Sequence, residues 1–237
     1  MPDKKVTFRG YEPTDAREFS EDKIELLKKA QAEIQWLLDR GYPIKKTVEF
    51  VGNHYLLSTR QRLALTRATT STSMLKLRQH KKLNACEHQR VYVDGLNLII
   101  TLEVALSETT LLKCMDGTVR DLAGLRGTYR IIDKTDEAIT LIGKKLAAMN
   151  VAEAVFYLDA PVSNMGRLKN RILDLLADYH YEVIVEVIDH VDEVLKSKSH
   201  VITTDSMILN ECESWINFAA EIIADNLNQV RTLNLHF

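Results

Sequence analysis

Aspartates follow three apolar runs of the chain, each at the point where a buried strand would end. They are Asp94 after residues 91–93, Asp159 after residues 155–158 and Asp205 just beyond residues 200–203. A fourth, Asp192, lies beyond the apolar run 183–188, near the start of an expected helix. Because the carboxyl ends of parallel strands meet at one edge of a sheet, we expect these side chains to converge there.

Carboxylates gathered in one crevice repel each other, and without a cation several of them would have raised pKa values. A hard divalent cation removes this conflict, and oxygen ligands without paired cysteines or histidines favour Mg²⁺ or Mn²⁺. Two such ions can activate a water and stabilise a leaving oxygen in phosphodiester hydrolysis. The candidate metal ligands and catalytic residues are therefore Asp94, Asp159, Asp192 and Asp205. The competing interpretation is that each aspartate only caps a helix.

Small polar and basic residues near these aspartates are candidates for contacts with substrate. The polar candidates, which could orient water, metal ligands or phosphate, are Asn97, Ser163, Asn164, Thr204 and Ser206. Arg120 lies in a polar, glycine-rich stretch, residues 116–130, of a kind that is often functional. Lys81 and Lys82 belong to a basic segment with Lys76, Arg78 and Arg90 directly before the Asp94 strand. This segment is either a path along which a polyanion approaches or a solvated connector. The helix that carries Arg60, Arg62 and Arg67 likewise presents either a phosphate-contacting face or a solvated one.

The elements that would hold these residues divide the chain into three parts. Residues 1–72 read as a small all-α domain with helices over about 24–38, 43–52 and onward from Ser58, where a capping-box pattern occurs. Residues 73–89 read as a basic linker. From residue 90, strands alternate with helices, which predicts an α/β domain with a doubly wound parallel sheet over 90–237.

Several elements of the α/β part can be placed more closely. Residues 111–122 predict a hairpin around Asp116-Gly117. Helices are expected over 131–149, 167–178 and 214–227, and a last strand over 230–237. Residues 98–106 are apolar enough to be either helix or strand, and both assignments stay open.

Composition limits the compartment and the partners. The net charge of −2 argues against a globally basic nucleic-acid binder, although a local basic patch is compatible with it. No apolar run is long enough to cross a membrane, and the polar N-terminus has no signal-peptide pattern. Three scattered cysteines without a CxxC pair predict free thiols in a reducing, cytoplasmic compartment. The sequence leaves open whether the chain forms a homo-oligomer.

Two motifs carry a resemblance to known domains. Residues 93–97, Val-Asp-Gly-Leu-Asn, resemble the first motif of PIN-like and NYN ribonuclease domains. Residues 191–195 followed by 201–206 resemble the later acidic pair of those domains, and residues 157–159 are similar to an NYN strand that ends in aspartate. The resemblance implies a PIN-like sheet, an acidic Mg²⁺ or Mn²⁺ site and cleavage of RNA. The helix acid could be Asp189 or Glu193 instead of Asp192, and the whole chain also resembles an uncharacterised prokaryotic family.

Three functions are therefore compared. The first is a metal-dependent nuclease that acts on RNA. The second is a non-catalytic nucleic-acid-binding protein on a degenerate PIN-like fold. The third is a phosphatase for a small substrate with an aspartate nucleophile, against which Leu96 stands where a second aspartate is often found. Nucleotide-binding fingerprints and a GxSxG elbow are missing from the sequence.

Overall fold

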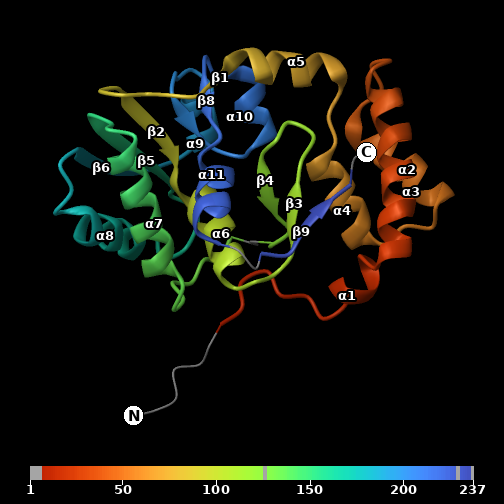
Figure 1. Ribbon diagram of the computed structural model, residues 1–237, viewed down its shortest axis with the longest axis horizontal. Coiled ribbons are helices and arrows are strands. Elements are labelled where there is room, and N and C mark those ends of the chain that lie inside the picture. Colours follow the sequence, from red (N-terminus) through yellow and green to blue (C-terminus); the bar gives the residue numbers. More distant parts are fainter. Residues whose placement is uncertain (1–6, 125–126, 228–229, 236–237) are drawn as a thin grey trace, which may run out of the picture.

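The main sheet consists of parallel strands in the order β1-β8-β7-β2-β5-β6 (Figure 1). The computed structural model describes residues 7–124, 127–227 and 230–235. The strands are β1 Lys82–Leu83, β2 Arg90–Asp94, β5 Glu153–Asp159, β6 Glu182–Ile188, β7 Val201–Ile202 and β8 Trp215–Ile216. The expected α/β architecture with a parallel sheet is confirmed.

Helices cover both faces of this sheet. One face packs against α6 Gly95–Leu106, α7 Thr135–Ala148, α8 Met165–Leu176 and α11 Phe218–Asn226. The other face packs against the short helices α9 Val191–Leu195 and α10 Ser206–Glu211. Successive side chains of a strand point to opposite faces, so a strand buried on both sides must be apolar throughout. In β5, Phe156 belongs to the first core, whereas Val155 and Tyr157 belong to the second.

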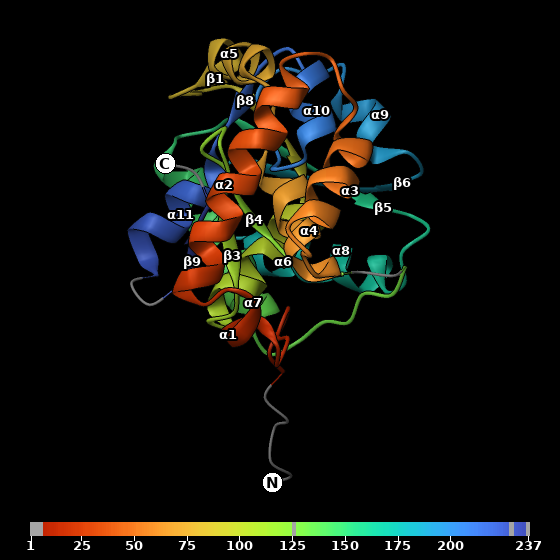
Figure 2. The ribbon, with the colours of Figure 1, turned by 90° about the vertical axis from the view of Figure 1, so that its right-hand side faces the viewer.

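A second, smaller sheet joins the N-terminal helices to the main sheet. Its strands, in the order β4-β3-β9, are β4 Val119–Asp121, β3 Leu111–Lys113 and β9 Thr232–Asn234. The N-terminal helices are α1 Asp15–Glu18, α2 Glu21–Leu38, α3 Ile44–His54, α4 Thr59–Ala68 and α5 Thr72–Lys81. Figure 2 shows α2 and α4 lying over this sheet, with α3 packed against these two helices. Their core includes Leu112 of β3 and Leu233 of β9, so helices and small sheet stabilise each other.

Helix α6 decides between the two assignments left open for residues 98–106. It is a helix that contacts both β5 of the main sheet and β3 and β4 of the small one. Residues 98–105 are all buried, because neighbours surround the helix. A helix that is apolar on every side lacks the amphipathic stripe that identifies a surface helix, which is why its sequence did not distinguish helix from strand.

Two segments differ from their sequence-based assignments. Residues 73–89, expected as a linker, include most of α5 and the edge strand β1. The helix expected over 214–227 begins only at Phe218, because Trp215 and Ile216 form β8 between β1 and β7. Trp215 is fully buried, so tertiary pairing overrides the helical pattern at this point. The expected 111–122 hairpin is confirmed, with Gly117 at a positive φ of 81° in its turn.

The structure also bears on the cysteines and on membrane-spanning segments. The cysteines Cys86, Cys114 and Cys212 are free, as the sequence predicted, and the structure buries all three. No helix in the described residues is both long and apolar enough to cross a lipid bilayer. Parts of three segments assigned from the sequence lie outside the described residues: 1–6 of the N-terminal domain, 125–126 of the stretch 116–130, and 236–237 of the expected last strand.

Candidate acidic site and the adjoining pocket

Asp94 is the last residue of β2 and is only 5 % exposed. Its Oδ2 accepts a hydrogen bond of 2.7 Å from the Thr203 hydroxyl. Burial raises the pKa of Asp94 to about 7, the Thr203 hydrogen bond opposes that rise, and the charges of three other aspartates add to it. These are Asp159, Asp205 and Asp192. The carboxylates predicted to converge therefore lie close enough to affect each other.

The turn after Asp94 is set by Gly95. A Cβ at this position would lie 2.8 Å from Leu158 Cδ2 and 3.1 Å from the Tyr157 carbonyl oxygen. The glycine is therefore needed for the close approach of β5, the neighbouring strand, as α6 begins directly after β2. The side chain of Asp94 makes no capping hydrogen bond to α6, so the helix-cap interpretation does not explain its place.

The other carboxylates come from different elements of the same edge. Burial and the charge of Asp192 raise the pKa of Asp159, which ends β5. Partial burial and the charge of Asp205 raise the pKa of Asp192, which lies in α9. Asp205 does cap a helix, because its Oδ1 accepts the N–H groups of Met207 and Ile208 at 2.7 and 3.3 Å. The capping interpretation is thus correct for Asp205 without removing it from the cluster.

The two alternative helix acids behave differently from Asp192. Glu193 forms an ion pair of 2.7 Å with Lys196, and its charge raises the pKa of Asp192. Of the three acids, Asp192 is the one whose charge is among the main causes of the raised pKa of Asp94. Asp192 is therefore the helix acid with the clearest link to the buried carboxylate.

The donor chemistry of the cluster fits Mg²⁺ or Mn²⁺, since all four groups offer hard carboxylate oxygens. Mutual repulsion among them is the condition that a bound cation would relieve. Among the described residues, no three His, Cys, Asp or Glu side chains are gathered tightly enough to form a ready-made metal shell. Mg²⁺ commonly uses one or two protein carboxylates and keeps several waters, which a looser set can provide.

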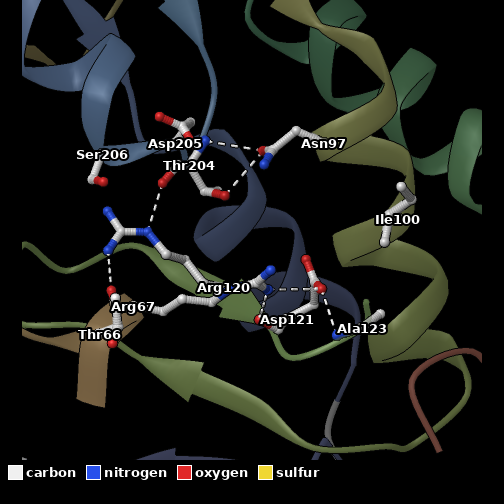
Figure 3. A pocket seen from close by; sticks show the side chains of 10 residues that line it. All are labelled: Thr66, Arg67, Asn97, Ile100, Arg120, Asp121, Ala123, Thr204, Asp205 and Ser206. Atoms are coloured by element: carbon white, nitrogen blue, oxygen red, sulfur yellow. Dashed lines mark hydrogen bonds and ion pairs between the residues drawn. The ribbon is translucent and has the colours of Figure 1, made fainter. Parts of the chain in front are cut away.

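Asn97 and Thr204 connect the acidic edge to a neighbouring hollow. Asn97 Oδ1 accepts both the Thr204 backbone N–H at 3.1 Å and the Thr204 hydroxyl at 2.9 Å. Because a backbone N–H can only donate, the amide oxygen must face Thr204 and the amide nitrogen must face away. Figure 3 shows this nitrogen directed into the hollow below.

The hollow is a pocket of about 320 Å³ between α4, α6, β4 and the loop after β7 (Figure 3). It is lined by Thr66, Arg67, Asn97, Ile100, Arg120, Asp121, Ala123, Thr204, Asp205 and Ser206. Asp205 thus belongs both to the acidic cluster and to the pocket wall. Of the predicted substrate contacts, Asn97, Arg120, Thr204 and Ser206 are brought together here.

Arg120 is buried and its guanidinium binds protein groups. It donates to the Thr204 carbonyl oxygen at 2.6 Å, to Asp116 Oδ2 at 2.6 Å and to the Arg67 carbonyl oxygen. Asp116 also pairs with Arg78 at 2.5 Å, so two buried guanidinium groups share one carboxylate. Arg120 therefore holds the pocket wall together.

The remaining predicted contacts lie elsewhere or bind other residues. Lys81 Nζ donates to the Asn210 carbonyl oxygen at 2.8 Å, and Lys82 lies in β1, which β8 and β7 separate from β2. Ser163 and Asn164 follow Asp159, but they bind Tyr129: its N–H donates to Ser163 Oγ at 3.2 Å, and Asn164 Nδ2 donates to its carbonyl oxygen at 2.7 Å. They anchor the loop after β5.

The sequence analysis did not identify Thr203 as a functional residue, and it did not predict that Arg67 lies near the acidic residues. Thr203 is one of the two threonines before Asp205, and its position at a strand end beside an aspartate was a usable signal. Arg67 comes from α4, far from the acidic residues in sequence, and only the tertiary packing brings it to the pocket.

The matches to known families divide the chain at the start of β1. Residues 83–221 match the family described as "Domain of unknown function (DUF5616)", and residues 26–81 match "Protein of unknown function (DUF434)". An uncharacterised protein of Methanocaldococcus jannaschii is 33 % identical over 207 residues, which cover 86 % of this chain and 98 % of that relative. No solved structure matches the chain.

Proposed function

The chain belongs to the family described as "Domain of unknown function (DUF5616)", and we propose that it is a metal-dependent nuclease that hydrolyses phosphodiester bonds in RNA. The proposal includes a PIN-like fold for residues 90–237 behind an all-α N-terminal domain. The observation that carries it is Asp94, a carboxylate buried at a strand end whose pKa is raised first by burial and then by the charges of three nearby aspartates. Keeping such a carboxylate buried is unfavourable for folding, and a bound cation would offset that cost.

Asp94, Asp159, Asp192 and Asp205 would hold Mg²⁺ or Mn²⁺. A bound ion of this kind lowers the pKa of water and neutralises charge on phosphate oxygens. The protein groups supply position: Thr203 fixes one carboxylate oxygen of Asp94, and its hydroxyl also accepts the Asp205 N–H at 3.0 Å. Asn97 holds the intervening Thr204 in place.

The small-substrate phosphatase has less support in the chain. Enzymes with an aspartate nucleophile often carry a second aspartate two residues later, where this chain has Leu96, which is buried. The adjoining pocket also extends the site beyond a single phosphate, which suits a polymeric substrate better.

The test is cleavage of single-stranded RNA and single-stranded DNA in Mn²⁺ by the full chain and two variants. We expect Asp94→Asn to abolish cleavage of RNA and to keep the fold. Asp178→Asn is the matched control, because it removes an exposed carboxylate beyond the end of α8 and should keep full activity. Intact RNA and DNA after incubation with the full chain would overturn the proposal, and equal cleavage by Asp94→Asn would remove Asp94 from the site.

A further inference from the structure

We infer that the pocket beside Asp205 binds one phosphorylated nucleotide unit of the substrate strand, and that Arg67 binds its phosphate. The inference rests on the proposed function for the identity of that strand. It assigns a role to the N-terminal helices, because Arg67 and Thr66 come from α4 while the other lining residues come from the α/β part. The two family matches meet at this pocket.

The size and lining of the pocket fit a nucleotide. Its volume of about 320 Å³ is at the small end of the range for organic ligands. Ile100 and Ala123 provide an apolar wall, on which a sugar or base can lie, and polar side chains form the rest. A site with an apolar wall and a few convergent polar groups is typical of small organic ligands rather than of bare ions.

Arg67 has hydrogen-bonding capacity left for a ligand. Its Nη1 donates to the backbone oxygen of Asp121 at 2.5 Å and to Asp121 Oδ1 at 3.2 Å. Its Nε and Nη2 donate to no residue in the described part of the chain, and Figure 3 shows the guanidinium lying across the pocket. Asp121 thus fixes the orientation of a planar group whose free donors match phosphate oxygens.

Asn97 and Ser206 supply further donors on the opposite side. With its oxygen bound by Thr204, the amide of Asn97 has only its NH₂ group to offer to the pocket. The Ser206 hydroxyl lines the pocket and makes no hydrogen bond within the described residues. A ligand rich in acceptor oxygens, such as a sugar phosphate, complements this set of donors.

Three arginines and three aspartates lie in and beneath the pocket, so their formal charges balance and the arginines bind an anion only through directed hydrogen bonds. Arg78 and Arg120 share Asp116. Asp121 offsets Arg67, and Asp205 lies at the border with the acidic cluster. A strand with one phosphate at the acidic edge could therefore place an adjacent phosphate against the arginine side.

The first test is equilibrium binding of single-stranded RNA to the full chain in EDTA, where no turnover occurs. We expect Arg67→Ala to weaken binding about tenfold, as for loss of a charge-assisted hydrogen bond. The log–log dependence on salt should become shallower by about 0.7, the value for one phosphate contact. Arg17→Ala is the control, since the Arg17 side chain is 79 % exposed on α1 and should not contribute.

The second test uses uridine 5′-monophosphate, uridine and inorganic phosphate as separate probes. We expect the monophosphate to bind more tightly than either part, and Arg67→Ala to reduce its affinity to that of uridine. Ala123→Phe fills the pocket without removing a charge and should block the monophosphate as well. This variant keeps the inference testable if Arg67→Ala does not fold. Inorganic phosphate that binds as tightly as the monophosphate would overturn the nucleotide assignment.

The outcomes separate the pocket from the nuclease proposal. Loss of monophosphate binding in Arg67→Ala, in a chain that cleaves no RNA, would support the pocket and overturn the nuclease. Unchanged binding in both variants, in a chain that cleaves RNA, would overturn the pocket and leave the nuclease in place.

Discussion

The hydroxyl of Thr203 donates a 2.7 Å hydrogen bond to Asp94 and in turn accepts the backbone N–H of Asp205 at 3.0 Å. Thr203 is 3 % exposed, so this link is shielded from water. The two hydrogen bonds connect the end of β2 to the loop after β7. The pairing of Val93 with Ile202 sets the register in which the ends of these two strands meet. One buried hydroxyl therefore fixes the relative position of two candidate metal ligands.

Thr203→Val should destabilise the protein because it removes this hydroxyl without changing the size of the side chain. Asp94 Oδ2 and the Asp205 N–H would lose their partner in a buried place, which costs about 1–3 kcal/mol of unfolding free energy. Urea denaturation measures the change, and Thr203→Ser, which keeps the hydroxyl, should recover most of it. Equal stability of the Val and Ser variants would show that the hydroxyl does not hold the two strand ends.

The stability of the metal-free protein should fall as the pH rises from about 4 to about 7, through the titration of Asp94. Its pKa is about 7 in the folded chain and 3.8 in the reference state. A pKa raised on folding means that the folded state holds the proton more tightly than the unfolded state does. The protonated Asp94 therefore stabilises the folded protein fully below the reference pKa, and this stabilisation disappears above the pKa of the folded chain. The loss is up to about 4 kcal/mol by this linkage.

Asp94→Asn isolates this contribution, because the amide cannot titrate. Without metal, the variant should gain stability relative to the wild type as the pH rises, and the difference should level off above pH 7. Urea denaturation at several pH values in EDTA measures it, with Asp178→Asn as the control. Parallel curves for wild type and Asp94→Asn would mean that Asp94 is not protonated in the folded protein near neutral pH.

The sequence was informative about the acidic edge because strands and the residues that end them are local features. An apolar run followed by aspartate can be read directly, and the parallel-sheet rule then places Asp94, Asp159 and Asp205 together. β8 could not be read in this way, since a strand of two residues exists only through its pairing with β1 and β7.

The sequence could not predict which groups the basic residues bind, because a count of charges does not identify ion-pair partners. Arg60 forms an ion pair with Asp15 at 2.8 Å, and Arg78 with Asp116 at 2.5 Å. Arg90 pairs with Glu153 at 2.5 Å. Each partner is distant in sequence, and each pair exists only after the chain has folded. The basic segment thus contributes to tertiary structure, whatever else it contacts.

Lys81 and Lys82 distinguish these roles. Lys81 donates to the last turn of α10 and Lys82 lies near the Trp215 ring, with its Nζ 6.0 Å from the ring centre. We therefore expect the double alanine variant to lower the melting temperature and to leave the salt dependence of RNA binding unchanged. A salt titration in Ca²⁺ measures this. A slope shallower by roughly 0.7 for each lysine would instead place both on the path of the strand.

Asp116 offers the strongest test of how the pocket is supported. Its side chain is 1 % exposed and binds Arg78, Arg120 and the Thr118 hydroxyl at 2.5, 2.6 and 2.6 Å. Burial alone would raise the pKa of Asp116, but Arg120, Thr118 and Arg78 together hold it below its usual value. Because the pKa of Asp116 is lowered on folding, its ionised carboxylate stabilises the folded protein at pH values above the pKa of the unfolded chain. This stabilisation is lost as the pH falls through the pKa that Asp116 has in the folded state.

Asp116→Asn should therefore cost about 3–5 kcal/mol near neutral pH, because two buried guanidinium groups lose the carboxylate they share. Asp225→Asn breaks a pair with Lys145 whose aspartate side chain is 61 % exposed, and it should have little effect on stability. The difference between the two variants should shrink in acid, as the wild-type Asp116 becomes protonated. Because Arg120 also holds the Thr204 and Arg67 carbonyl oxygens, Asp116→Asn should weaken uridine 5′-monophosphate binding as well. A stable Asp116→Asn variant with wild-type nucleotide affinity would show that the buried ion pairs do not shape the pocket.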